Sequence, residues 1–352
     1  MGDTQPVSRY RETSWYREAP GPVPLDEVMR DVEQQVNDGN VARFQPLELG
    51  FSPLDEVLNG GMRPGELMVI GGPYGVGKTI LGLQIARNVA KNDKGTCALY
   101  VCYEHDRTHL LSRLLCLESA ERVRGEDALT LRYLAKLAFR PGDTVGLISK
   151  LRQDYRYADL IESIEAYSKR LVLAKASGVY SSLHEIRQWM NDLMSSDYQR
   201  FLLVIDYLQK IPVDRELLRT EEEVTTHLTH NLKELALSRG IQVIAIAAAD
   251  RLGLQAKRMR LSHLRGSSAI QYETDIGIVL NNKHDIVSRE HMIYNLSQAE
   301  EMRNWVVMSV EKNRAGAHAV DMEYTLDGAH FRILPEGRFV RERLIDEKVI
   351  RE

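Results

Sequence analysis

The sequence predicts an α/β protein of three layers, with a mostly parallel central sheet and an antiparallel addition toward its C-terminal end. From about residue 44 onward, short and continuously apolar runs alternate with longer segments that have the apolar spacing of helices. Runs of this kind, rich in β-branched residues, are typical of parallel strands that are covered on both faces. In addition, a glycine-rich segment joins the first run to a helix, which is the order of a phosphate-binding loop.

Six runs are predicted to form the parallel part of the sheet, and three later runs its antiparallel part. The six parallel strands are expected at Leu67–Gly71, Ala98–Tyr103, Leu171–Ala174, Phe201–Asp206, Val243–Ala248 and Ile276–Leu280. The three antiparallel strands are expected at Trp305–Val310, Met322–Thr325 and His330–Leu334. Between the second and third runs, the polar stretch 119–168 has the period of helices.

Three segments of the chain are predicted from these patterns. Residues 1–43 read as a flexible arm and a short amphipathic helix, residues 44–335 as the α/β domain, and residues 336–352 as a charged tail. The apolar stripe of the helix must be covered, either by its own domain or by a neighbouring subunit. The stripe consists of Leu25, Val28, Met29, Val32 and Val36.

The composition excludes some classes of protein. The formal net charge of -4 over 352 residues argues against a uniformly basic nucleic-acid coat, although it allows a local basic channel. No apolar run approaches the roughly 20 residues of a membrane helix, and the first residues have no apolar core like that of a secretion signal. The sequence has three cysteines, which are too few for a disulfide framework and do not have the spacing of zinc ligands. They are Cys97, Cys102 and Cys116. We therefore expect a cytoplasmic protein without a membrane partner.

A phosphate site is predicted from Gly72 to Thr79, which reads G-P-Y-G-V-G-K-T and matches G-x-x-x-x-G-K-T. The glycines let backbone N–H groups converge on phosphate oxygens, and the dipole of the helix that follows favours the negative charge. Lys78 is expected to bridge the β- and γ-phosphates of ATP. The alternative is a chance match in an unrelated loop. The residues expected to contact the nucleotide are Gly72, Gly75, Gly77, Lys78, Thr79 and Ile80.

Two acidic residues complete the predicted site. Asp206 ends an apolar run, which delivers its carboxylate to the edge of the sheet where ligands bind, and it is expected to hold Mg²⁺ together with the Thr79 hydroxyl. Glu104 follows another apolar run and could orient or deprotonate water. The alternative for Glu104 is a surface residue at a helix start, where the dipole favours a carboxylate.

Taken together, these motifs resemble the motor domain of the DnaB-type replicative helicases, a branch of the RecA-like ATPases. The resemblance extends from about Phe44 to Leu334. It rests on the phosphate loop and on four further segments. These are Tyr103-Glu104, the run V-I-D-Y-L-Q at 204–209, L-R-G-S at 264–267 followed by E-T-D at 273–275, and K-N-R-A-G at 312–316.

The resemblance implies roles that the residues alone leave open. It implies that Glu104 is the catalytic carboxylate beside Lys78, and that Lys312 and Arg314 act in trans on the γ-phosphate bound to the adjacent subunit. A cation aimed at the transferring phosphoryl group stabilises transition-state charge. The alternative is a pair of solvated cations at a strand end. Head-to-tail contacts of this kind generate rings or filaments, and the family likeness implies a homo-oligomer that forms a hexameric ring.

Two features depart from the family pattern. Family members generally carry a glutamine that senses the γ-phosphate where this sequence has Ala248, and a methyl group cannot make that hydrogen bond. The residues before Phe44 are also too few for the helical domain that binds primase in the replicative enzymes. We therefore do not expect a complete replicative helicase, and residues 25–37 correspond in position to the family's linker helix.

Two loops that face the central channel in the likeness would bind single-stranded DNA. The first contains Lys210, Arg215 and Arg219, and the second contains Arg251, Lys257, Arg258 and Arg260. Binding of phosphates by such clusters is independent of sequence and sensitive to salt. The alternative is a solvated basic face, and Arg265, near the end of the second loop, could instead pair with Asp275.

The predicted function is that of an ATP-hydrolysing motor that binds single-stranded DNA and translocates on DNA or unwinds it as a ring, with ATP and Mg²⁺ as ligands. The alternative is a RecA-like regulatory or assembly ATPase whose nucleotide state controls a protein partner. Ala248 and the acidic charge balance favour the second interpretation. The V-I-D-Y-L-Q run and the basic second loop favour the first.

Overall fold

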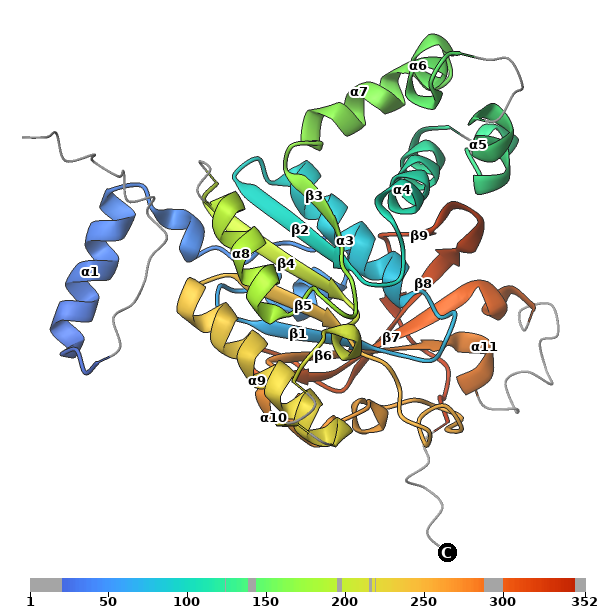
Figure 1. Ribbon diagram of the computed structural model, residues 1–352. Helices are drawn as coiled ribbons and strands as arrows, with labels where there is room; N and C mark the ends of the chain where they lie inside the picture. The colour runs from blue at the N-terminus through green and yellow to red at the C-terminus, as the bar shows by residue number, and fades with distance from the viewer. Residues whose placement is uncertain are drawn as a thin grey trace, which may run out of the picture.

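The computed structural model describes residues 21–123, 125–138, 144–194, 198–214, 217–218, 220–287 and 300–345. Its centre is a ten-stranded sheet with the order β10-β8-β7-β6-β1-β5-β4-β2-β3, and β9 pairs with β8 outside this path (Figure 1). The non-consecutive order of the central strands places β1 between β6 and β5. The predicted α/β fold is confirmed.

The six predicted parallel strands are all present. They are β1 (Leu67–Gly71), β2 (Thr96–Cys102), β3 (Leu171–Lys175), β4 (Arg200–Asp206), β5 (Gln242–Ile246) and β6 (Ile276–Asn282). Each parallel pair among them is in continuous register. Strand β5 ends at Ile246 and not at the predicted Ala248, because the chain turns there into a loop that returns at Leu264.

The antiparallel addition consists of β7 (Trp305–Asn313), β8 (Val320–Asp327), the short β9 (Arg332–Ile333) and β10 (Arg338–Phe339). His330 lies in the short helix η6 (Gly328–His330), so β9 begins two residues later than predicted. The described part of the segment that was predicted as a charged tail, 336–352, joins the sheet. Strand β10 pairs with β8, and Leu344 forms a bridge with Val287. Residues 346–352 lie outside the described residues.

Burial of Glu323 explains why a charged segment joins the sheet. Its carboxylate is 1% exposed on β8, forms an ion pair with Lys283 at 2.5 Å, and accepts a hydrogen bond at 2.5 Å from Arg338 on β10. Because an unpaired buried charge is costly, these cations hold residues 338–342 against the sheet edge. Lys283 also bonds Glu342 at 2.8 Å.

Helices cover both faces of the parallel strands, which gives the three layers (Figure 1). Met68 and Ile70 pack toward α3 (Lys78–Asn92), whereas Leu67 and Val69 pack toward the opposite layer. This alternation follows from the period of two along a strand. The opposite layer consists of α8 (Leu183–Met194), α9 (Glu221–Arg239) and α10 (Ser267–Glu273).

The described part of the polar stretch 119–168 is mostly helical, as predicted, and belongs to a helical lobe beside β3 (Figure 1). The lobe contains its own small core, in which Leu115, Leu134 and Leu151 pack with Tyr157. Its helices are α4 (Arg107–Arg122), η2 (Gly125–Asp127), α5 (Leu131–Ala138), α6 (Leu147–Gln153) and α7 (Ala158–Tyr167).

The predicted amphipathic helix is α1 (Leu25–Asn37), which lies apart from the sheet (Figure 1). None of its residues is buried, and its stripe remains open to solvent, with Leu25 74% and Met29 64% exposed. Its own domain therefore does not cover this stripe. The remaining short elements are η1 (Val41–Arg43), α2 (Leu54–Val57), η3 (Leu208–Lys210), η4 (Leu261–His263), α11 (Lys283–Ile286) and η5 (Met302–Asn304).

Cys97, Cys102 and Cys116 are free thiols, and all three are buried. Among the described helices, none has the length and apolar character that a membrane crossing requires.

Candidate nucleotide-binding site

The phosphate loop leaves the carboxyl end of β1 and runs into the first turn of α3, which begins at Lys78. Gly75 and Gly77 have φ angles of 75° and 103°, which residues with a Cβ atom rarely adopt. The loop borders a cavity of about 450 Å³, within the size range of ligand pockets. All six residues predicted to contact the nucleotide line this cavity.

Lys78 places its amine against the loop itself. The Nζ atom donates hydrogen bonds to the carbonyl oxygens of Gly72 and Pro73, each at 2.8 Å. Burial lowers the pKa of Lys78, and the negative charges of Asp206 and Glu104 oppose this shift. The amine therefore lies in a partly desolvated position where an anionic oxygen would bind favourably.

Asp206 ends β4 with 1% exposure, at the sheet edge that the sequence predicted. Its carboxylate accepts a hydrogen bond from the Tyr100 hydroxyl at 2.7 Å. Burial raises the pKa of Asp206, while hydrogen bonds from Tyr100 and Thr79 lower it.

This arrangement suits Mg²⁺, because the ion prefers oxygen ligands and usually takes one or two protein groups, completing its shell with water and substrate phosphates. Thr79 and Asp206 supply such oxygen atoms, and a bound cation would compensate for the desolvation of the Asp206 carboxylate. Among the described residues, no group of three or more His, Cys, Asp and Glu side chains forms a fuller metal cage.

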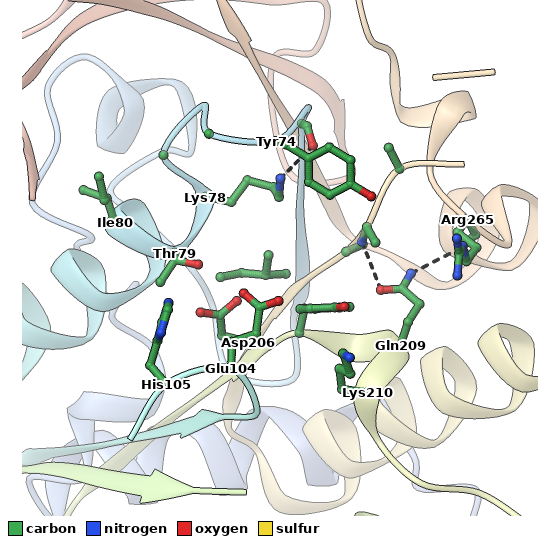
Figure 2. Close-up of a pocket in the computed structure, with 18 of the residues that line it drawn as sticks. Tyr74, Lys78, Thr79, Ile80, Glu104, His105, Asp206, Gln209, Lys210 and Arg265 are labelled. Atoms are coloured by element: carbon green, nitrogen blue, oxygen red, sulfur yellow. Dashed lines mark hydrogen bonds between the residues drawn. The ribbon is translucent and has the colours of Figure 1, made fainter. Parts of the chain in front are cut away.

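Glu104 reaches the same cavity from the neighbouring strand. Strands β2 and β4 pair so that Cys102 lies opposite Asp206, and Glu104 follows two residues later. Figure 2 shows the carboxylates of Glu104 and Asp206 beside one another in the cavity. The structure thus brings Lys78, Thr79, Glu104 and Asp206 together from three separate segments.

Several lining residues were missed by the sequence reasoning. The Arg113 guanidinium lies 5.0 Å from the centre of the Phe331 ring and hydrogen-bonds His109 and His105 at 3.0 Å. Burial and the charge of Arg113 lower the pKa of His105. Positions 105, 109 and 113 are spaced four residues apart directly after Glu104. This spacing, which is visible in the sequence, predicts that their side chains lie on one side of the segment. Phe331 gives no such signal, because it comes from the distant segment before β9.

Lys312 and Arg314 lie at the opposite edge of the sheet from the phosphate loop. Lys312 pairs with Gly277 on β6, and Gly277 lies opposite Val69 on β1. Arg314 is bonded to Asp275 at 3.2 Å, next to the start of β1. The five residues of β1 place its two ends about 13 Å apart. These two cations therefore do not contribute to the cavity of their own subunit.

Only some of the basic residues in the two predicted DNA-binding loops are exposed. Lys210 lies at the cavity rim and is exposed, as are Arg251 and Lys257 in the second loop. Arg260 bonds Glu311 at 3.1 Å. The prediction that Arg258 binds DNA is wrong. Its side chain is 6% exposed and bonds Asp321 at 2.5 Å, so it is not available to a DNA phosphate.

Three further predictions concern charged residues of these loops. Arg265 bonds Glu221 at 3.2 Å, and not Asp275, which was its alternative partner. Asp275 instead bonds Lys233 at 2.7 Å and Arg314. Arg215 and Arg219 lie outside the described residues.

Comparisons with known proteins agree with this geometry. Residues 47–332 match the family model described as DnaB-like helicase C terminal domain. The replicative DNA helicase DnaB of Mycoplasma genitalium is 28% identical over 87% of this chain and 60% of its own length. The replicative DNA helicase DnaB of Geobacillus stearothermophilus is 27% identical over 64% of this chain and 45% of its own length. The chain thus spans about half the length of the curated relatives it matches.

Solved structures with the same fold include an ATPase domain with a TM-score of 0.68 and 19% identity, covering 89% of this chain and 99% of that chain. Another is a DnaB-like replicative helicase that was described with its interactions with primase. Its TM-score is 0.64 at 19% identity, over 89% of this chain and 67% of that chain.

Proposed function

The chain belongs to the family of DnaB-like helicase C-terminal domains, and from this premise we propose that it is an ATP-driven motor acting on single-stranded DNA as a ring of identical subunits. The observation that carries the proposal is the convergence of Lys78, Thr79, Glu104 and Asp206 on one cavity beside a glycine-rich loop. This set supplies groups for holding phosphates, for holding a cation and for activating water.

Each group has a role in phosphoryl transfer to water. The backbone amides of the phosphate loop and the Lys78 amine would bind the phosphates of ATP, and Thr79 and Asp206 would hold Mg²⁺. The cation would neutralise charge on the phosphate oxygens. Glu104 would orient the attacking water and accept its proton, since it is the carboxylate beside Asp206 that has no role in holding the cation.

The Arg113–Phe331 pair supports a position for the base of the nucleotide. The guanidinium lies over the aromatic ring, 5.0 Å from its centre, and both side chains line the cavity. Flat, partly apolar surfaces of this kind suit stacking with a purine. We propose that the base packs against this pair.

A second copy of the chain would complete the site. Lys312 and Arg314 lie at the sheet edge opposite the cavity, so head-to-tail contact can present them to the phosphates bound by a neighbour. The exposed stripe of α1 supports the same arrangement, because a neighbouring subunit could cover it. By likeness to its family, we propose a hexamer.

The DNA would contact Lys210, Arg251, Lys257 and Arg260. One copy presents a modest charge, but repetition around a ring would sum these residues into a strong field in the channel. Arg258 is left out of this set because Asp321 holds it inside the domain.

One observation favours a second candidate function, a regulatory ATPase whose nucleotide state controls a protein partner. The cavity wall carries Ala248 where an amide side chain would connect the phosphates to the second loop, and a methyl group cannot donate a hydrogen bond. Such an enzyme would hydrolyse ATP without a response to DNA.

Steady-state ATP hydrolysis, with and without single-stranded DNA at low and moderate salt, separates the two functions. The motor is expected to show stimulation by DNA that falls as salt rises, because salt competes for phosphate contacts. The Lys78→Ala variant is the blank. Hydrolysis that ignores DNA at every salt concentration would favour the regulatory ATPase.

A further inference from the structure

We propose that Gln209 is a positioning residue that connects the phosphate cavity to the second basic loop, and so takes the place that Ala248 cannot fill. This inference rests on the proposed function, because it assigns to Gln209 the link between bound nucleotide and the loop that would contact DNA.

The second loop leaves and re-enters the fold through a narrow neck. Ala249 forms a β-bridge with Leu264. The backbone N–H of Asp250 donates to the His263 carbonyl at 2.9 Å, and that of Arg265 donates to the Ala248 carbonyl at 3.0 Å. The segment that contains Arg251 and Lys257 is therefore held by this neck on one side and by the bond of Arg258 to the sheet on the other.

The side chain of Gln209 bonds both sides of the neck. Its Oε1 atom accepts a hydrogen bond from the backbone N–H of Ala248 at 3.0 Å, and its Nε2 atom donates to the Arg265 carbonyl at 3.5 Å (Figure 2). A backbone N–H on one side and a carbonyl on the other fix the orientation of the amide. Gln209 thus closes the neck from the side of the cavity.

Gln209 also belongs to the nucleotide cavity. It follows Asp206 by three residues and lines the cavity together with Ala248 and Arg265. The turn that holds it is fixed by a hydrogen bond from the Lys210 N–H to the Tyr207 carbonyl at 3.1 Å. Its amide therefore lies where the cavity and the loop meet.

The two bonds of the amide are unequal, which allows a response to charge. At 3.5 Å the bond to Arg265 is at the long limit of a hydrogen bond, whereas the bond to Ala248 has ordinary length. An anionic phosphate oxygen is a stronger acceptor than a backbone carbonyl. A nucleotide in the cavity would draw the Nε2 group away from Arg265 and loosen one side of the neck.

The test is hydrogen–deuterium exchange of residues 249–265, with and without a saturating non-hydrolysable ATP analogue and Mg²⁺. In the wild type, the analogue should change exchange in this segment. The Gln209→Ala variant should lose this change. The Gln209→Glu variant should lose it too while keeping the neck protected without analogue, because its carboxylate accepts from Ala248 but cannot donate.

Gln255→Ala is the matched control, because this exposed glutamine lies in the same loop away from the neck, and its response should equal that of the wild type. A Gln209→Ala variant that binds the analogue and keeps the wild-type response would overturn the inference. So would a wild-type loop that ignores an analogue it demonstrably binds, although the proposed ATPase function would then stand. If a fluorescent derivative of the analogue does not bind at all, both the inference about Gln209 and the proposed ATPase function would be contradicted.

Discussion

Replacing Arg258 with alanine distinguishes a structural arginine from one that binds DNA. Arg258 belongs to the second basic loop, yet its guanidinium bonds Asp321 on β8 at 2.5 Å and Ser309 on β7 at 3.2 Å. The side chain is 6% exposed, so the loop is fastened to the sheet through a desolvated charge. The substitution should therefore destabilise the fold as well as the loop.

The expected loss in the free energy of unfolding follows from how far Arg258 and Asp321 are exposed. Removing one member of a fully buried ion pair costs about 3–5 kcal/mol, and a charge-assisted hydrogen bond contributes about 1.5–3 kcal/mol. Asp321 is 29% exposed, so water can solvate part of the charge that remains. We expect a loss of about 2–3 kcal/mol in the free energy of unfolding.

The assay is urea unfolding of wild type and variant at the same protein concentration. With a slope of about 3 kcal/mol per molar urea, the midpoint of Arg258→Ala should fall by about 0.7–1 M. Lys257→Ala, an exposed neighbour in the same loop, should stay within about 0.5 kcal/mol of the wild type. An Arg258→Ala variant with the wild-type midpoint and weakened DNA binding would refute the structural role.

The remaining predictions concern assembly and chemistry. Arg314→Ala subunits should be inactive alone but should recover part of their ATP hydrolysis when mixed with Glu104→Gln subunits, because hybrid interfaces restore one complete site; no recovery in a steady-state assay would argue against completion in trans. Val32→Asp should lower the oligomer mass in analytical ultracentrifugation by placing a charge in the α1 stripe, and an unchanged mass would mean that α1 does not join subunits. Burial raises the pKa of Cys97 and of Cys116 to about 12, so the native thiols should hardly react with a thiol reagent at about pH 8 and should react after unfolding. Fast labelling of the native protein would contradict their burial.

The parallel strands could be placed from sequence because their signal is local. A continuous apolar run such as Phe201–Asp206 fixes both the strand and the carboxylate that ends it, and the phosphate loop is a single contiguous motif. The meeting of Glu104 with Asp206 could be expected as well, since parallel strands end at one edge of a sheet.

The errors concern residues whose partners lie far away in the sequence. Arg258 lies in a sequence segment rich in basic residues, but its partner Asp321 is 63 residues away on β8. The segment from residue 336 looks like a charged tail until the buried carboxylate of Glu323 supplies its anchor. Phe331 enters the cavity from the segment between β8 and β9. Periodicity carries no information about such pairings.

The central claim, that this cavity hydrolyses ATP through Glu104, is tested most directly by single-turnover hydrolysis of ATP beside a measurement of ATP binding. We predict that the wild type binds and converts ATP, and that Glu104→Gln binds it with similar affinity but loses conversion by at least a hundredfold, the lower end of the roughly 10²–10⁴-fold effect of a general base. A Glu104→Gln variant that converts bound ATP at the wild-type rate would contradict the account.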